Sequence, residues 1–119
     1  MTIELRQPTP ILRMFDEAKA REFYVDYLGF SINWEHRYGD DFPLYLEIQR
    51  GGCTIHLSAH HGDCTPVSAL RIPVNDSKAL YAEITTKQYR YAKPGYDAQE
   101  KEFCITDPFG NRLMFHDPD

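Results

Sequence analysis

The chain has few cysteines, no long apolar run and no typical catalytic motif, and each of these absences argues against a class of protein. Its 119 residues contain three cysteines, Cys53, Cys64 and Cys104, with no CxxC pair. This odd number argues against both a disulfide framework and a zinc ribbon. No apolar stretch approaches the ~20 residues that span a membrane, and the N-terminus MTIELRQPTP has no apolar signal core. We therefore expect a cytoplasmic protein with no membrane partner.

Basic residues are also in the minority. The formal charge of −5 comes from 18 acidic and 13 basic residues, which argues against a nucleic-acid partner because such binding depends on basic surface. The acidic balance either favours a cationic ligand or simply keeps a small protein in solution.

Motifs that activate a nucleophile or bind phosphate are missing as well. The sequence contains no Gly-x-Ser-x-Gly, no cysteine–histidine signature, no telling pair of carboxylates and no phosphate-binding glycine loop. Catalysis is therefore the less favoured expectation, although these absences do not decide it.

The sequence does contain the same order of elements twice. In the first half, Asp16 is placed to cap a helix over 17–28 that Gly29 ends, between an apolar strand at 10–15 and strands at 30–37, 44–50 and 53–58. In the second half, Asn75 or Asp76 caps a helix over 77–88, between a strand at 69–74 and strands at 89–93, 101–106 and 111–116. This order predicts an α+β fold of two βαβββ modules in tandem that form a curved, cleft-lined sheet. The chain would be one domain over 1–119, with modules of about 5–60 and 66–117.

The alternation of apolar and polar residues assigns faces to the first strand of each half. Leu12 and Met14 share one face, and Arg13 lies on the other; Arg71 holds the same place in the second half. Two arginines on the faces away from the helices suit either the wall of a wet cleft or a solvent-exposed rim. Cys104, in KEFCIT, is expected in the strand core.

Two stretches of the sequence are similar to a known family. FDEAKAREFYVDYLGF and ITDPFGNRLMFH resemble the signature segments of the vicinal oxygen chelate superfamily, which holds glyoxalase I, extradiol dioxygenases, fosfomycin-resistance enzymes and metal-free bleomycin-resistance proteins. Within it, NWEHRY, PLYLEI and IHLSAHHGD look most like the bleomycin-resistance branch. The resemblance implies paired βαβββ modules and a homodimer whose ligand clefts involve both chains. Whether modules pair within one chain or across two is left open.

The resemblance also implies four metal-ligand positions, one on each of four strands. These positions hold Thr9, His56, Ala69 and Met114 here, so a single competent ligand remains. Divalent ions need at least two or three converging donors. We therefore expect no metal ion and no other cofactor at this place.

Residues 53–64, CTIHLSAHHGDC, contain further donors. Strand parity places Thr54, His56 and Ser58 on the face that the resemblance assigns to the cavity, followed by a Gly-containing loop. This loop is either a polar connector that borders the cleft or a non-standard metal site made by its donors, which are His60, His61, Asp63 and Cys64.

These observations favour a metal-free protein that binds a planar, cationic antibiotic of the bleomycin type and so confers resistance. The alternatives are a metal-dependent lyase or dioxygenase-like enzyme using His56, or a binder of another small molecule. Planar ligands stack on aromatic rings, and Trp34 shares a strand face with His36. The expected ligand-binding residues are Trp34, His36, Tyr38, Phe42, Tyr45, His56, Ser58, His60, His61, Asp63, Arg71, Phe109, Arg112 and Met114.

Overall fold

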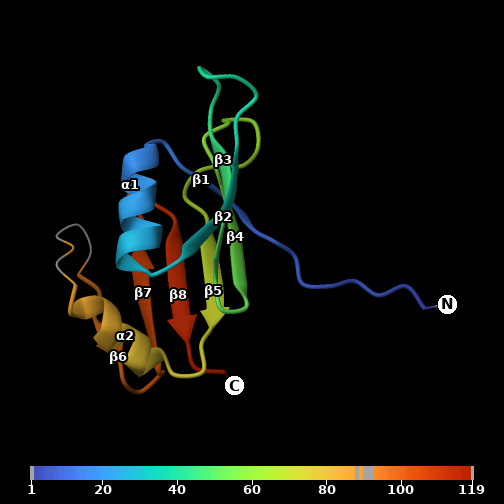
Figure 1. Cartoon of the computed structure of the whole chain (residues 1–119). Helices are drawn as coiled ribbons and strands as arrows, with labels where there is room; N and C mark the ends of the chain where they lie inside the picture. The colour runs from blue at the N-terminus through green and yellow to red at the C-terminus, as the bar shows by residue number, and fades with distance from the viewer. Residues whose placement is uncertain (1, 88, 90–92, 119) are drawn as a thin grey trace.

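The computed structural model describes residues 2–87, 89 and 93–118. The first module consists of β1 (Ile11–Arg13), α1 (Glu17–Arg21), the π-helix η1 (Glu22–Tyr27), β2 (Ser31–His36), β3 (Tyr45–Arg50) and β4 (Cys53–Ser58). The second consists of β5 (Ala69–Pro73), α2 (Ser77–Thr85), β6 (Tyr96–Asp97), β7 (Glu102–Thr106) and β8 (Arg112–His116). The predicted fold class is confirmed: the chain is an α+β protein with the order βαβββ repeated (Figure 1).

Each module forms its own four-stranded sheet. The strand orders are β1-β4-β3-β2 and β5-β8-β7-β6, which we call sheet A and sheet B. In both sheets the first strand runs parallel to the last strand of the module, and the other neighbours are antiparallel. Both helical segments lie on the same side of the two sheets, so the opposite faces stay open (Figure 1).

The first helix begins and ends where its sequence predicts. The Asp16 side chain accepts a hydrogen bond from the Lys19 amide at 3.0 Å, and Gly29 adopts the left-handed φ of 78° that ends the segment. From Glu22 onward the turns widen into a π-helix, which the 3.6-residue period does not reveal. The predicted apolar face is buried throughout; its members are Ala20, Phe23, Tyr24, Tyr27 and Leu28.

The core lies between the helices and the inner faces of the sheets. Strand alternation is confirmed in β1, where Leu12 and Met14 are buried, and in β4, where Ile55 and Leu57 are buried. In β7 the prediction was wrong for Cys104, which is exposed. Phe103 and Ile105 fill the core instead, because successive strand residues point to opposite faces and the two larger apolar side chains take the inner one.

The two modules are joined by a buried polar loop. Asp107 accepts hydrogen bonds from the Tyr24 hydroxyl (2.5 Å) and from the Phe109 and Asn111 amides (both 2.8 Å). The Asn111 side chain donates to the Arg13 carbonyl at 2.9 Å and accepts from the Ser68 amide at 3.0 Å. The DPFGN hairpin therefore connects the first strand of module one to the entry of module two.

The strand predicted at 89–93 falls largely outside the described residues. Residues 90–92 of the stretch 89–93 lie outside the described residues, and Tyr89 and Lys93 are not in a strand. The described strand in this region is β6, which starts three residues later and pairs with β7 through Tyr96 and Asp97. In the described part of the chain, no helix has the length and apolar character needed to cross a membrane.

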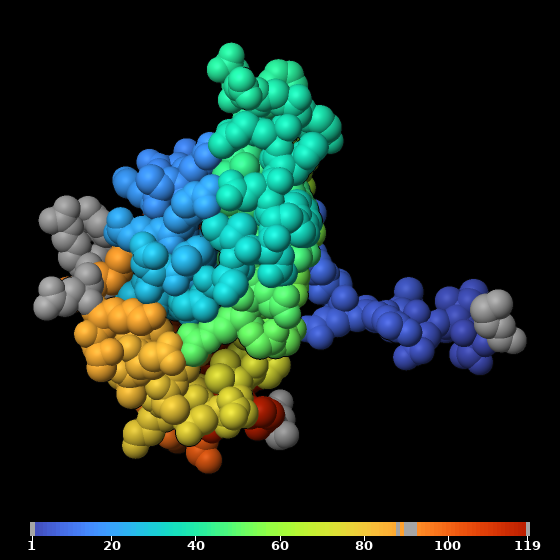
Figure 2. Space-filling view, viewed as in Figure 1, coloured from blue at the N-terminus to red at the C-terminus, as the bar shows by residue number. Residues whose placement is uncertain are grey.

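The N-terminal segment, residues 2–9, extends away from both sheets (Figures 1 and 2). Ile3 and Leu5 are 89% and 94% exposed, and they alternate with Glu4 and Arg6. Such alternation is typical of a strand with one buried face, yet residues 2–9 are all exposed.

Candidate functional site

The open face of sheet A carries aligned rows of polar and aromatic side chains. The cross-strand register places Arg13, Ser58, Tyr45 and His36 in one row. The adjacent row is Ile11, His56, Glu47 and Trp34. Residues opposite one another in a sheet point to the same side, so these side chains share one surface.

A register shift adds another polar residue to this surface. The pairing of β2 with β3 shifts between Ile32 and Trp34, as in a β-bulge. The Asn33 amide thereby reaches the open face and donates to Glu47 at 2.8 Å and to Gln49 at 2.9 Å.

Glu47 organises the histidine beside it. His56 Nε2 lies 2.9 Å from Glu47 Oε1, and His56 Nδ1 lies 2.6 Å from the Tyr45 hydroxyl. A carboxylate only accepts, so in the neutral ring Nε2 carries the proton and Nδ1 accepts from Tyr45. Donation from Asn33, then from His56, lowers the pKa of Glu47. Burial is the main reason that the pKa of Tyr45 is raised, so its hydroxyl keeps its proton.

Trp34 is the exposed ring above this network. Its ring lies 5.9 Å from that of Tyr45 with an interplanar angle of 10°, and His56 meets both rings edge-on. Trp34 is 42% exposed, so a flat, partly open aromatic surface remains. Planar ligands stack on such rings.

A second aromatic group lies at the end of the β2–β3 hairpin. Tyr38 contacts His36 at 4.7 Å, His60 at 6.0 Å and Phe42 at 6.5 Å between ring centroids. Tyr38 and Phe42 are exposed. The structure thus brings four more predicted residues together beside the Trp34 surface.

The loop after β4 folds back onto the sheet. Ser58 is fully buried; its hydroxyl donates to Asp63 at 2.6 Å and accepts from the His60 amide at 3.1 Å. Asp63 is therefore bound to the strand, while His61 points into solvent at the loop surface. Nowhere in residues 2–87, 89 and 93–118 do three His, Cys, Asp or Glu side chains converge as a metal site would require. Ser58 and Asp63 thus bind this loop to the strand.

The four metal-ligand positions of the superfamily do not fit a metal ion here. Both ring nitrogens of His56 are hydrogen-bonded, one to Tyr45 and the other to Glu47. The positions on sheet B hold Ala69 and Met114, whose side chains offer no oxygen or nitrogen ligand. No reaction step through a metal ion is derived for these residues.

The remaining predicted residues lie on or near sheet B. Arg71 and Met114 are in register on its open face, and Arg112 pairs with Ala69 two residues away on the same face. Arg71 forms an ion pair with Glu102 at 3.4 Å. Among the described residues, no hydrogen bond, ion pair or ring contact joins this group to the Trp34 surface. Phe109 is buried and meets Phe15 edge-on, so it belongs to neither open face.

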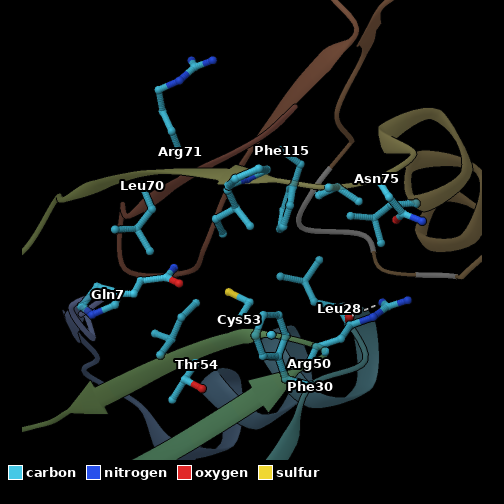
Figure 3. Close-up of a pocket in the computed structure, with 18 of the residues that line it drawn as sticks. Gln7, Leu28, Phe30, Arg50, Cys53, Thr54, Leu70, Arg71, Asn75 and Phe115 are labelled. Atoms are coloured by element: carbon cyan, nitrogen blue, oxygen red, sulfur yellow. Dashed lines mark hydrogen bonds between the residues drawn. The ribbon is translucent and has the colours of Figure 1, made fainter. Parts of the chain in front are cut away.

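Sequence reasoning missed a separate hollow between the modules. It has a volume of about 990 Å³ and lies between β5 and the β3–β4 hairpin (Figure 3). Leu70 and Phe115 point into it, whereas Arg71 points away. Of the predicted site residues, only Arg71 borders it. Its lining combines core residues from two modules, so no local pattern could have revealed it; the lining includes Leu28, Phe30, Cys53, Ile55, Leu70, Ile72, Val74 and Phe115.

Comparison with known proteins agrees with the fold and the sequence motifs. The chain belongs to the glyoxalase superfamily, because residues 1–118 match the family described as glyoxalase superfamily protein. The resemblance to the vicinal oxygen chelate superfamily is thereby confirmed. A comparison with curated proteins found no match to this chain.

Several solved structures share the fold. The bleomycin-binding protein of Streptomyces verticillus, solved with copper(II)-bleomycin, is 27% identical; the match covers 99% of this chain and 100% of that chain with a TM-score of 0.69. An antibiotic-binding protein from Streptomyces sp. CB03234 is 18% identical, with 99% and 100% covered and a TM-score of 0.70. Leishmania major glyoxalase I is also 18% identical, with 95% and 87% covered and a TM-score of 0.70. Both binding proteins and an enzyme therefore share this fold.

Proposed function

We propose that the protein binds a planar, cationic antibiotic of the bleomycin type and protects against it by sequestration, without chemistry. The observation that carries the proposal is the Trp34–Tyr45 pair, a partly open aromatic surface fixed by the Glu47–His56 network. The similarity to the S. verticillus bleomycin-binding protein supports it.

The energy required is modest. A dissociation constant of 1 µM corresponds to about 8 kcal/mol. Each ring that stacks on the ligand adds about 1 kcal/mol beyond the buried area. Rings already held by contacts, such as Tyr45 and His56, lose little conformational freedom on binding.

Negative charge for a cationic ligand is available next to the aromatic groups. Asp40 and Asp41 lie exposed in the β2–β3 hairpin, near Tyr38 and Phe42. Glu35, in contrast, forms an ion pair with Arg21 of α1, on the face that the helices cover. We therefore assign attraction of a cationic group to the hairpin rather than to Glu35.

The proposal includes a homodimer. Within the described part of one chain, no hydrogen bond, ion pair or ring contact joins the open face of sheet A to that of sheet B. A second copy would place sheet B of one chain opposite sheet A of the other, bringing Arg71, Arg112 and Met114 to the Trp34 surface. The exposed Ile3 and Leu5 supply apolar area for such an interface.

A titration of bleomycin tests the proposal. Trp34 is the only tryptophan, so its fluorescence reports on the site directly. We expect saturable quenching and a rise in thermal stability, because a stacked ligand stabilises the folded state. Trp34→Ala should bind about tenfold or more weakly by calorimetry, while Trp34→Phe, which keeps a ring, should lose much less. No response of the wild type at about 100 µM drug would contradict the proposal.

Metal analysis of the purified protein distinguishes binding from the enzymatic alternative. Sequestration without chemistry requires no bound metal ion, and the donors described above do not fit one. Stoichiometric, tightly held metal would instead support a lyase or dioxygenase-like enzyme. Loss of that metal in His56→Ala would place it at this site.

A further inference from the structure

The strongest unexplained feature outside the aromatic surface is the Arg13 side chain. Arg13 is 9% exposed, and its Nη1 atom is buried without a hydrogen-bond partner. Its other guanidinium nitrogens also lack a hydrogen bond or ion pair to any described residue. The group lies over the Phe15 ring, whose centroid is 4.8 Å from Cζ.

A buried guanidinium without an acceptor is costly, because the charge has left water and gained no partner. Four other arginines of the described chain show the usual solution, because each pairs with a glutamate: Arg21, Arg37, Arg50 and Arg71. Arg13 has no such partner. An acceptor from outside the chain would supply what the fold does not.

We infer that Arg13 is the anchor of a subsite for an organic carboxylate. A guanidinium presents a planar fork of N–H donors, which matches the two oxygens of a carboxylate. Nη1 has no competing acceptor, so binding would displace no internal bond. This subsite is independent of the proposed antibiotic binding, since it recognises the opposite charge.

The groups around Arg13 are partly apolar. Phe15 lies over the guanidinium, is 60% exposed and meets Phe109 edge-on. Cys64 is close enough to feel the charge of Arg13: burial raises the pKa of its thiol, and the charge of Arg13 opposes this shift. The thiol therefore stays neutral and does not compete for the guanidinium. Asp63 is held by Ser58 and forms no ion pair with Arg13.

Arg13 lies in the same cross-strand row as Tyr45 of the aromatic surface. Arg13, Ser58 and Tyr45 occupy successive strands in one row, so Arg13 and Tyr45 are about 10 Å apart, two strand spacings. The loop residue Asp63 lies over Ser58 between them. Small carboxylates should therefore bind at Arg13 without covering Trp34.

The test compares carboxylates with their neutral amides. Thermal shift and calorimetry are measured with acetate against acetamide and with benzoate against benzamide. We expect the wild type to be stabilised by at least one carboxylate and by neither amide. Arg13→Met, of similar size but uncharged, should lose the response, and Arg13→Lys, which lacks the fork, should bind at least tenfold more weakly. Arg21→Met, which removes a surface charge on α1, should respond like the wild type.

The ligand-free variants supply a second readout. Because the guanidinium is unpaired, Arg13→Met should melt at the same temperature as the wild type or higher. An equal response to amide and carboxylate, no response to any carboxylate, or a response retained in Arg13→Met would overturn the inference. A lower melting temperature of Arg13→Met together with loss of self-association would assign the acceptor to a second copy instead. If Arg13→Met fails to fold, Arg13→Lys decides. Failure of bleomycin to bind leaves this result untouched.

Discussion

At the scale of single residues, the candidate site depends on how many donors converge on one carboxylate. Glu47 accepts from Asn33 and His56, and this fixes His56 against Tyr45. A side chain held by several bonds keeps its rotamer, so Trp34 stands beside rigid neighbours. Preorganisation of this kind favours reversible binding of a rigid ring.

The lowered pKa of Glu47 leads to a prediction about acid. The folded state favours the carboxylate, so its contribution to stability is present above the ordinary value of 4.5 and is lost as the pH falls through the lowered one. We expect Trp34 fluorescence to show a step as the pH falls below about 4.5. Glu47→Gln should lack this step, with circular dichroism confirming that both proteins are folded. Identical profiles for variant and wild type would contradict the assignment.

At the scale of elements, the hairpin between β7 and β8 connects the two modules through buried hydrogen bonds. Its buried Asp107 carboxylate has no cationic partner among the described residues, but hydroxyl and amide donors surround it. Burial, then the charge of Asp107, raises the pKa of Tyr24 well above its ordinary value, so Tyr24 remains a donor. The motif that identifies the family thus serves folding in this chain.

Removal of the Asn111 side chain tests this role. Asn111→Ala breaks bonds to the Arg13 carbonyl, the Ser68 amide and Asp107, and leaves buried groups unpaired. We expect the free energy of unfolding to fall by about 2–4 kcal/mol in urea denaturation. Asn75→Ala, at an exposed position before α2, should change it by less than about 0.5 kcal/mol. Equal changes in the free energy of unfolding for the two substitutions would show that the hairpin does not hold the modules together.

At the scale of the whole molecule, the two open sheet faces and the N-terminal segment are unused within one chain. The segment extends beyond the body of the protein, and its alternating pattern requires a surface to pack on (Figure 2). We expect a second copy to supply that surface, as the proposed dimer requires.

Substitutions within residues 2–9 test whether this segment forms part of a dimer interface or stays in solvent. Ile3→Ser with Leu5→Ser should weaken self-association by 100-fold or more, because burial of each side chain is worth about 1.5–3 kcal/mol. Glu4→Ser with Arg6→Ser changes the alternate positions and should leave association unchanged. Sedimentation equilibrium measures both variants. A wild type that is monomeric at all concentrations would contradict the dimer.

Local patterns predicted much of the fold. Asp16, Gly29 and the apolar face of the first helix act over a few residues, and the alternation in β1 and β4 assigned their faces correctly. The failures have long-range causes. Cys104 was placed in the core because a single short strand does not show which of its faces meets the helices. The register shift at Asn33 depends on how β3 pairs with β2.

The sequence by itself determined the two βαβββ modules, their caps and turns, the family, and the scarcity of metal donors, because each follows from local spacing or from residue identity. Only the tertiary structure decided which donors meet which acceptors. In the folded chain Glu47 accepts hydrogen bonds from Asn33 and His56, and Glu35 pairs with Arg21. Arg13 Nη1, in contrast, is buried without a hydrogen-bond partner among the described residues. Such pairings join residues far apart in the chain, and only the packing of strands, loops and helices fixes the distances between them.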